Sequence, residues 1–442
     1  MLPWGLCSRE GRHLAEQRKF GFETRMLHAG QIPDPYVGAR AVPIYQTTSY
    51  VFKDAEEAAH LFELKQYGNI YSRISNPTNA VFEERMASLE NGAGAVAVAS
   101  GMAAQFTTLM TLLSPGDRLL ASTQLYGGSL TMLAHTLKKL SVEVDFVDPS
   151  EASVWEAAMT PQTKAMFVEI IGNPVGSIPD LTGLAELSKA KGIPLIVDNT
   201  FATPYLCRPI EWGATIVVHS ATKFIGGHGT SIGGVVIDSG DFDFSGYPSV
   251  ADPSPSYHGL RFYDTFGHYG FLMKLRAETV RDTGACISPT NTFLLLQGLE
   301  TLSVRMDAHL RNARAVASFL ESHPKVSRVH YAGLPSHPQY ERAKHYLPKG
   351  PGAVMAFEVK PTSGGAREAG KRLIEGLQLF SHLANVGDAK SLVIHPASTT
   401  HQQLSDEELV TCGIAAATIR LSIGIETEED LLWDLDQALS AI

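Results

Sequence analysis

Two stretches of sequence decide the predicted fold: IPLIVDNT at residues 193–200 and ATIVVHSATK at residues 214–223. Each contains a run of apolar, mostly β-branched residues, which is typical of a parallel strand buried on both faces. The first run ends at Asp198, and the second is followed by Lys223. Parallel strands bring their carboxyl ends to one edge of a sheet, where open α/β sheets bind ligands. We therefore expect this carboxylate and this amine to lie in one ligand site.

Such a pair suits the cofactor pyridoxal 5'-phosphate (PLP). Lys223 can form a Schiff base with the aldehyde of PLP once burial or a nearby cation lowers its pKa. Asp198 can keep the pyridine nitrogen protonated, so that the ring withdraws electrons. Each residue alone also has an ordinary structural interpretation, because a lysine can cap a strand and an aspartate can cap the next helix. The two together favour the cofactor site.

The surrounding residues extend this pattern into a sheet. Apolar runs predict strands at residues 93–99, 118–121, 142–147, 165–171, 193–197, 214–218 and 233–237. Helices are predicted between them at residues 101–113, 128–140, 151–159 and 180–191. Strands that alternate with helices predict an α/β fold with a mostly parallel sheet covered by helices on both faces.

The pattern changes after residue 238. Residues 238–262 contain Pro and Gly at intervals and predict an irregular insertion, which a helix-rich stretch follows at residues 291–322. A smaller α+β domain is then predicted, with strands at residues 326–331, 354–359, 391–394 and 418–423 and helices at 366–376, 406–412 and 428–441. We predict an N-terminal extension and arm over residues 1–70, a cofactor-binding α/β domain over 71–290, and a C-terminal α+β domain over 291–442.

Composition narrows the function classes. The chain has 442 residues, of which 44% are hydrophobic and 19% charged, as in a globular protein. Its net charge of -10 argues against a nucleic-acid partner. The four cysteines are widely spaced without a C-x-x-C pair, which predicts neither a disulfide framework nor a metal site. The first 20 residues lack the apolar core of a signal peptide, and no run is long enough to span a membrane. We expect a cytoplasmic protein without a membrane partner.

Further candidate site residues follow other predicted strands. Gly101 and Met102 open a helix whose free N–H groups can hold a phosphate, although small residues also open helices for packing reasons. Tyr126 can stack on a planar cofactor and relay protons, or it can be an ordinary tyrosine at the edge of the core. Asn173 can bind the cofactor's ring oxygen, or it can serve the turn that it forms with Pro174.

Two arginines are candidates for binding anions. Arg73 is a bidentate donor suited to phosphate, and Tyr71 adds a hydroxyl, unless both simply belong to a solvated loop. Arg420 lies within an apolar run and therefore needs a partner. The α-carboxylate of an amino-acid substrate would be such a partner, and so would a structural ion pair with an acidic residue.

One motif suggests a different enzyme class. Ser220 and Lys223 match the S-x-x-K pattern of penicillin-recognising acyl enzymes. The chain contains neither S-D-N nor K-T-G, and the motif follows a strand of a parallel α/β pattern. The context therefore excludes this alternative.

Five motifs together resemble the Cys/Met-metabolism family of fold-type I PLP-dependent enzymes, over residues 20–442. They are YSRxxNPT at 71–78, SGM at 100–102, DNT at 198–200, HSATK at 219–223 and HPAS at 395–398. The resemblance implies a fold-type I transferase in which Lys223 is the Schiff-base lysine and proton shuttle, Asp198 the pyridinium partner and Tyr126 the ring-stacking tyrosine.

The same resemblance implies the remaining site residues. The expected phosphate ligands are Gly101, Met102, Ser220 and Thr222, and the expected carboxylate binders are Arg420 and Ser391. In this family the residues that correspond to Tyr71 and Arg73 reach into the neighbouring subunit's site. The resemblance therefore implies an obligate homodimer, usually paired into a dimer of dimers.

Two stretches indicate the subfamily. Residues 385–392, NVGDAKSL, and the insertion around residues 253–259 resemble O-acetylhomoserine sulfhydrylases, and the position after Tyr126 lacks the cysteine typical of methionine γ-lyases. This implies γ-replacement on O-acetylhomoserine by sulfide or a small thiol, giving homocysteine or methionine and acetate. A cystathionine γ-synthase or γ-lyase, and a non-catalytic binding or assembly protein on the same fold, remain alternatives. The sequence leaves open an acetyl or succinyl ester, and sulfide, methanethiol, cysteine or a carrier-protein thiocarboxylate as donor.

Overall fold

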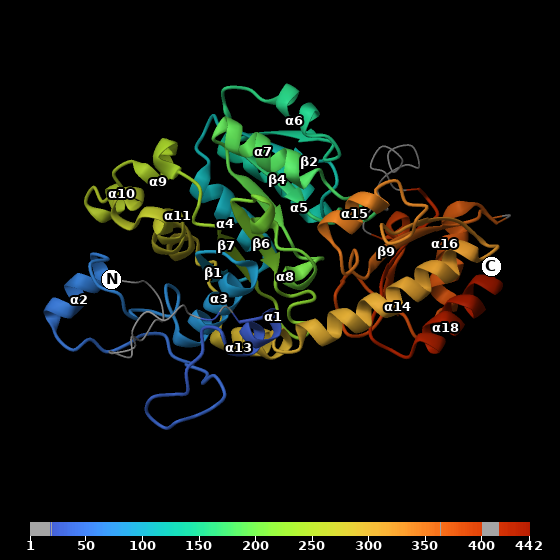
Figure 1. Ribbon diagram of the computed structural model, residues 1–442, viewed down its shortest axis with the longest axis horizontal. Coiled ribbons are helices and arrows are strands. Elements are labelled where there is room, and N and C mark those ends of the chain that lie inside the picture. Colours follow the sequence, from blue (N-terminus) through green and yellow to red (C-terminus); the bar gives the residue numbers. More distant parts are fainter. Residues whose placement is uncertain (1–17, 19, 363, 400–414) are drawn as a thin grey trace.

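The computed structural model describes residues 18, 20–362, 364–399 and 415–442. Most of the predicted N-terminal extension of residues 1–20 and the helix predicted at residues 406–412 lie outside the described residues. Two sheets are surrounded by helices, and the chain passes from the larger to the smaller sheet along the long helix α14 (Figure 1).

The larger sheet contains the strands that the sequence predicts. Its order within the described residues is β1 (Gly94–Val98), β7 (Gly234–Asp238), β6 (Ile216–Ser220), β5 (Leu195–Asp198), β4 (Thr163–Glu169), β2 (Arg118–Ser122) and β3 (Glu143–Val147). Neighbouring strands pair in parallel except for β7, which is antiparallel to both β1 and β6. The prediction of a mostly parallel sheet is confirmed.

Helices flank this sheet and continue the chain. Those before and between its strands are α1 (Phe22–His28), α2 (Ala55–Phe62), α3 (Pro77–Glu90), α4 (Gly101–Leu112), α5 (Gly127–Thr131), α6 (Ala152–Ala158), α7 (Leu181–Lys191) and α8 (Thr203–Leu206). Those after it are α9 (Pro248–Ala251), α10 (Phe262–Phe266), α11 (Gly270–Lys274), α12 (Arg281–Thr283), α13 (Pro289–Leu299), α14 (Leu302–Ser322), α15 (Tyr340–Tyr346), α16 (Ala366–Gly376) and α18 (Glu428–Ser440).

Both faces of the larger sheet are buried, which explains its continuous apolar strands. Along β5, Leu195 and Val197 belong to one buried cluster, which also contains apolar residues of α3 and α7. Ile196 lies between them and belongs to a second cluster, with residues of α4. Because side chains alternate along a strand, the two clusters lie on opposite faces. Helices on both faces leave the strand ends as the place for polar side chains.

The smaller sheet forms the C-terminal α+β unit. Its order is β10 (Ser381–His382), β11 (Leu392–Ile394), β12 (Thr418–Ser422), β9 (Val354–Val359) and β8 (Val326–His330). The pair β10–β11 is parallel, and the other pairs are antiparallel. The predicted fold class is therefore confirmed. The division of the chain into domains at residues 70 and 290 stays a prediction.

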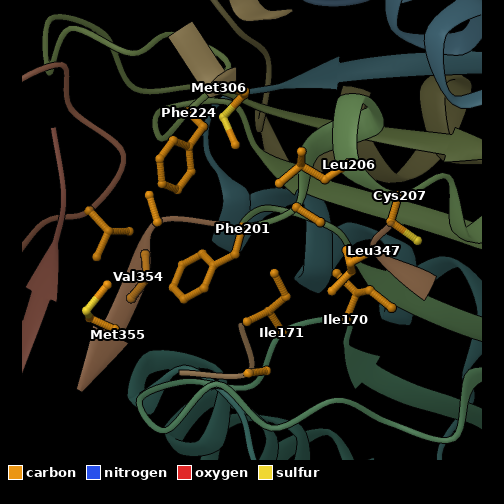
Figure 2. Packing of buried hydrophobic residues seen from close by; sticks show 14 of the residues in the cluster. Ile170, Ile171, Phe201, Leu206, Cys207, Phe224, Met306, Leu347, Val354 and Met355 are labelled. Carbon is orange, nitrogen blue, oxygen red and sulfur yellow. The ribbon is translucent and has the colours of Figure 1, made fainter. Parts of the chain in front are cut away.

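One apolar cluster joins the two sheets. Phe201 and Phe224, which follow β5 and β6, are buried in the same cluster as Met306 of α14 and Met355 of β9 (Figure 2). Because this contact holds the smaller sheet against the larger one, polar side chains of the C-terminal unit can reach the strand ends of the larger sheet.

Some helices were not predicted from the sequence. Helix α3 has no amphipathic stripe, because polar residues such as Glu83 and Arg85 are buried along with its apolar ones. Helices α10–α12 follow the predicted insertion, and apolar residues do not recur in them with a clear helical period. The helix predicted at residues 128–140 is α5 followed by a π-helical turn, Met132–Thr136, and a 3₁₀ turn, Leu137–Leu140. None of the helices that the structure describes combines the length and apolar character that a membrane span requires.

Candidate active site

A pocket lies at the carboxyl edge of the larger sheet, where β4, β5 and β6 end and α4 and α5 begin. Its lining contains most of the predicted site residues: Gly101, Met102, Tyr126, Asn173, Asp198, Ser220, Thr222, Lys223 and Arg420. The structure thus brings together side chains that are up to about 320 positions apart in the sequence.

The start of α4 forms one wall of this pocket. The Ser100 hydroxyl accepts the N–H of Ala103 at 3.0 Å, while the N–H groups of Gly101 and Met102 have no acceptor within the helix. A Cβ on Gly101 would lie 2.4 Å from the Cβ of Ser220. Only glycine therefore lets this helix end approach β6 so closely. Two free N–H groups at the positive end of a helix dipole suit a phosphate.

Hydroxyls from the end of β6 complete this wall. Thr222 Oγ1 donates to the carbonyl of Gly233 at 3.2 Å and accepts its N–H at 3.1 Å. The hydroxyl of Ser220 has no hydrogen bond with any of the described residues, and its backbone N–H donates to Thr200 Oγ1 at 2.8 Å. The Ser220 hydroxyl is therefore available to a ligand beside the start of α4.

Asp198 is held in place by two donors. Its Oδ1 accepts the N–H of Thr200, and its Oδ2 accepts Nε2 of Gln105, both at 2.9 Å. The Oε1 of Gln105 in turn accepts the Ser129 hydroxyl at 2.8 Å. The next helix, α8, begins only at Thr203, so Asp198 is not its cap. Its carboxylate is oriented from α4 and α5 and faces the pocket.

A second carboxyl lies beside Asp198. Glu169 is the last residue of β4 and pairs with Asp198 in the sheet register. Its Oε1 accepts the backbone N–H of Tyr126 at 2.6 Å. Burial and the neighbouring Asp198 raise the pKa of Glu169 well above its ordinary value, which favours its neutral form. Tyr126 presents a half-exposed ring on the same side of the pocket.

Lys223 lines the same pocket as these carboxyl groups. Its Nζ donates to the side-chain oxygen of Asn385. Burial, with the nearby guanidinium of Arg420, lowers the pKa of Lys223 to about 8. The turn after Lys223 is held by Arg305 of α14, whose guanidinium donates to the carbonyls of Phe224 at 2.7 Å and Ile225 at 3.1 Å. The amine is thus partly desolvated and fixed in position.

Arg420 brings a second cation into the pocket from β12. Its Nη1 donates to Asn173 Oδ1 and its Nη2 to the carbonyl of Asn385, both at the long distance of 3.4 Å. In the part of the chain that the structure describes, it forms no ion pair with a carboxylate. Burial lowers the pKa of Arg420 to about 10. A buried guanidinium with only long hydrogen bonds is suited to a ligand's carboxylate rather than to a structural ion pair.

Three predicted site residues do not line this pocket. The Ser391 side chain is fully buried, its hydroxyl donates to Glu426 at 2.9 Å, and it accepts the N–H of Gly424 at 2.8 Å. Its hydroxyl is therefore already bonded within the protein, and the expectation that it binds the carboxylate stays a prediction. Tyr71 and Arg73 are exposed outside the pocket, with the guanidinium 5.4 Å from the ring centroid. Their reach into a neighbouring subunit stays a prediction.

Two lining residues whose side chains bond to Asp198 or Lys223 were missed from the sequence. Gln105 lies one helical turn after Gly101, on the same face of α4, so its spacing was a usable signal. Asn385 lies in the loop between β10 and β11 and is 162 positions from Lys223, which it contacts. No local pattern identifies a residue of this kind.

Known proteins resemble the chain over nearly its whole length. The model of a family described as Cys/Met metabolism PLP-dependent enzyme matches residues 23–440. The O-acetyl-L-homoserine sulfhydrylase of Leptospira meyeri is 47% identical over 436 residues, which cover 96% of this chain and 98% of that protein. The homocysteine synthase of Schizosaccharomyces pombe is 49% identical over 423 residues, covering 95% and 98%.

A solved structure resembles the chain over the same range. The crystal structure of a putative O-acetylhomoserine (thiol)-lyase from Campylobacter jejuni superposes with a TM-score of 0.91 at 42% identity. The match covers 95% of this chain and 100% of that one. That structure contains an N'-pyridoxyl-lysine 5'-monophosphate.

Proposed function

The chain belongs to the Cys/Met-metabolism family of PLP-dependent enzymes, and from this premise we propose that it replaces the acetoxy group of O-acetyl-L-homoserine with sulfide or a small thiol. The products are homocysteine, or methionine, and acetate. Relatives that are 47–49% identical over nearly the whole chain carry the names O-acetylhomoserine sulfhydrylase and homocysteine synthase. The observation that carries the proposal is the meeting of Lys223, Asp198 and Arg420 in one pocket.

The pocket fits PLP. Glycine at position 101 and the free N–H groups at the start of α4 leave room for the phosphate and supply donors to it. We assign the phosphate to Gly101, Met102, Ser220 and Thr222, the pyridine nitrogen to Asp198, the ring oxygen to Asn173, the ring face to Tyr126 and the aldehyde to Lys223. When bound, the cofactor supplies the electron sink of the reaction.

The chain's own residues orient the substrate and move its protons. Arg420 holds the α-carboxylate with a bidentate guanidinium. Lys223, with its pKa lowered to about 8, is unprotonated in an appreciable fraction at neutral pH and removes the proton from the α-carbon. A second proton leaves the β-carbon before the acetoxy group departs, and Tyr126 stands beside the pocket as a further proton relay. Buried walls of Ile171 and Phe201 limit access of water.

An assay of the purified protein tests the proposal. With O-acetylhomoserine and sulfide, we expect release of acetate and formation of homocysteine in equal amounts, measured by chromatography and mass spectrometry. Methanethiol, cysteine and a thiocarboxylated carrier protein are offered in parallel as donors, and O-succinylhomoserine as the alternative ester.

Other outcomes assign other functions. Much faster reaction of O-succinylhomoserine with cysteine would indicate a cystathionine γ-synthase instead. Absence of turnover together with absence of the cofactor's visible absorption would indicate a non-catalytic protein on this fold.

We further propose that the functional unit is a homodimer, paired into a tetramer, in which Tyr71 and Arg73 complete the neighbour's pocket. Three points support it: both residues are exposed outside their own pocket, the family resemblance implies that they reach across an interface, and the N-terminal arm exposes apolar side chains. Among the latter, Tyr36 is 89% and Val51 is 100% exposed, and apolar surface of this kind is typical of protein contacts.

Mixing two inactive variants tests the shared site. Arg73→Ala and Lys223→Ala should each lack activity, because one removes the phosphate donor and the other the amine. Co-expressed, they should recover about a quarter of the wild-type activity, since half of randomly formed dimers are hybrids with one intact site of two. Light scattering gives the mass of each preparation. No recovery in dimers that are shown to be hybrid would contradict the proposal.

A further inference from the structure

We propose that Asn385 is a further catalytic residue, whose side-chain amide receives the amine of Lys223 whenever that amine is free and holds it where it removes the α-proton. This inference rests on the proposed function, because it assigns a role within the same reaction. Asn385, and not Ser391, is then the residue that this loop contributes to the site, because the hydroxyl of Ser391 is bound to Glu426.

The geometry around Asn385 links the two cations of the pocket. Its side-chain Oδ1 accepts Nζ of Lys223, and its backbone carbonyl accepts Nη2 of Arg420 at 3.4 Å. One residue therefore stands between the lysine amine and the guanidinium that we assign to the substrate's carboxylate. The carboxylate and the α-proton are on the same carbon. An amine held at Asn385 is thus close to the place that we assign to the α-carbon.

The loop that carries Asn385 is fastened to the turn of Lys223. Gly387 has a φ of +76°, and a Cβ there would lie 2.9 Å from the backbone carbon of Lys223. Its N–H donates to Ser422 Oγ at 2.9 Å, and the N–H of Ala389 donates to the carbonyl of Gly227 at 2.9 Å. Only glycine fits at this contact. The close approach of the two backbone segments therefore fixes the position of Asn385 relative to Lys223.

An amide suits this position better than a carboxylate. The other ionisable groups that line the pocket are Arg420 from β12, Tyr126 before α5, Glu169 from β4 and Asp198 from β5. Asn385 accepts a hydrogen bond from the amine without adding a negative charge next to it. A carboxylate there would favour the ammonium form and raise the pKa of Lys223, by roughly 1–3 units for opposite charges in contact. The base would then be protonated at neutral pH.

The step assigned to the pair is a single proton transfer. The bond between the α-carbon and its hydrogen breaks, and the proton forms a new N–H bond at Nζ of Lys223. The electron pair of the broken bond stays with the substrate and is delocalised with the help of the bound cofactor. The resulting ammonium donates to Asn385 Oδ1, which is a stronger hydrogen bond than that of the neutral amine. Asn385 thus stabilises the product of the transfer as well as positioning the base.

Exchange of the α-proton isolates this step. The holoenzyme is incubated in D₂O with L-norvaline, which has no leaving group, and loss of the α-proton signal is followed by NMR. Asn385→Ala should slow exchange by about 10²-fold, the effect of a base misplaced by about 1 Å. Asn385→Asp should move the acid limb of the pH–rate profile to higher pH by about one unit or more. Exchange is lost below this limb, because the amine must be unprotonated to act.

Asp388→Asn is the matched control. It exchanges the same two residue types in the same loop, but its carboxylate accepts the N–H of Lys390 at 3.1 Å and does not line the pocket. It should leave both the exchange rate and its pH profile unchanged. Cofactor content by visible absorption, and thermal unfolding, show whether each variant is folded and loaded.

A second readout does not depend on turnover. In the full chain before the cofactor is added, the rate at which acetic anhydride modifies Lys223 is measured against pH by peptide mass spectrometry. The midpoint should lie near pH 8 in the wild type, where burial and Arg420 place the pKa of Lys223. It should rise in Asn385→Asp and stay in Asp388→Asn.

The outcomes distinguish this inference from the proposed function. If the wild type forms homocysteine while Asn385→Ala exchanges the α-proton within twofold of the wild-type rate, the role of Asn385 is wrong and the function stands. An unchanged Lys223 midpoint in Asn385→Asp would equally overturn it. If the wild type exchanges the α-proton but forms no homocysteine, the proposed function fails and the role of Asn385 is still tested by its own variants.

Discussion

Lys223→Ala is expected to lower turnover by about 10⁴-fold, the upper range for removal of a positioned acid–base group. Lys223 is the only lysine that lines the pocket in the described part of the chain. In the proposed mechanism its amine is both the group that binds the aldehyde and the base that removes the α-proton. The variant should still bind the cofactor, because we assign its phosphate to the start of α4 and to Ser220, which the substitution leaves in place.

Borohydride reduction separates binding from chemistry in this variant. In the wild type, reduction followed by peptide mass spectrometry should find the cofactor fixed to Lys223. In Lys223→Ala the cofactor should co-purify but leave on denaturation after the same treatment. Lys390→Ala is the control, since this lysine is in the nearby loop with a side chain 75% exposed. Turnover within tenfold of the wild type in Lys223→Ala would contradict its assignment as base and covalent residue.

The strand-end residues could be predicted because a strand that is buried on both faces has a continuous apolar sequence. Helices cover both faces of the larger sheet, so a strand reads as an apolar run, and the first polar residue after it lies at the sheet edge. Asp198 was placed in this way, whereas Lys223 lies a few residues beyond its apolar run, after His219 and Ser220. An apolar run does not indicate the direction of its strand in the sheet. Asp238 also ends an apolar run, GVVID at residues 234–238, but β7 is antiparallel, so this carboxylate lies at the opposite edge.

Contacts between distant segments could not be predicted. The hydroxyl of Ser391 donates to the carboxylate of Glu426, 35 positions later, and nothing in the local sequence indicates this partner. Asn385 meets Lys223 only because one apolar cluster joins the two sheets. Helix α3 was missed for a related reason. Its buried polar residues pair with partners far along the chain, as Glu83 does with Arg276 at 2.7 Å, so no amphipathic period remains.

The charge of Asp198 can be removed without removing its shape. In Asp198→Asn one oxygen still accepts the N–H of Thr200, and the new amide can donate to Gln105. The Gln105 amide then turns over and donates to the Ser129 hydroxyl, which accepts as readily as it donates. The hydrogen-bond chain that now runs from Ser129 through Gln105 to Asp198 is thereby reversed rather than broken. The fold and the bound cofactor should persist.

What Asp198→Asn loses is the negative charge that we assign to the cofactor's ring nitrogen. Two opposite charges in contact at a partly screened site interact by about 4 kcal/mol, which corresponds to about 10³-fold in rate. Turnover should fall by about this factor with little change in thermal stability. The neighbouring Glu169 does not replace the charge, because burial raises its pKa well above the ordinary value. Steady-state kinetics, cofactor content and thermal unfolding of the variant measure these effects.

Asp238→Asn is the matched control for this loss. Asp238 is also the buried last residue of a strand, and its Oδ1 accepts the N–H of Gly240 at 3.1 Å. Burial raises its pKa to about 7, but it lies at the opposite edge of the sheet. Its substitution should leave turnover unchanged. If Asp198→Asn kept its turnover, or if both variants lost it equally, the pyridinium would not depend on Asp198. If only Asp198→Asn loses turnover, catalysis depends on the charge at the carboxyl edge and not on a buried carboxylate at any strand end.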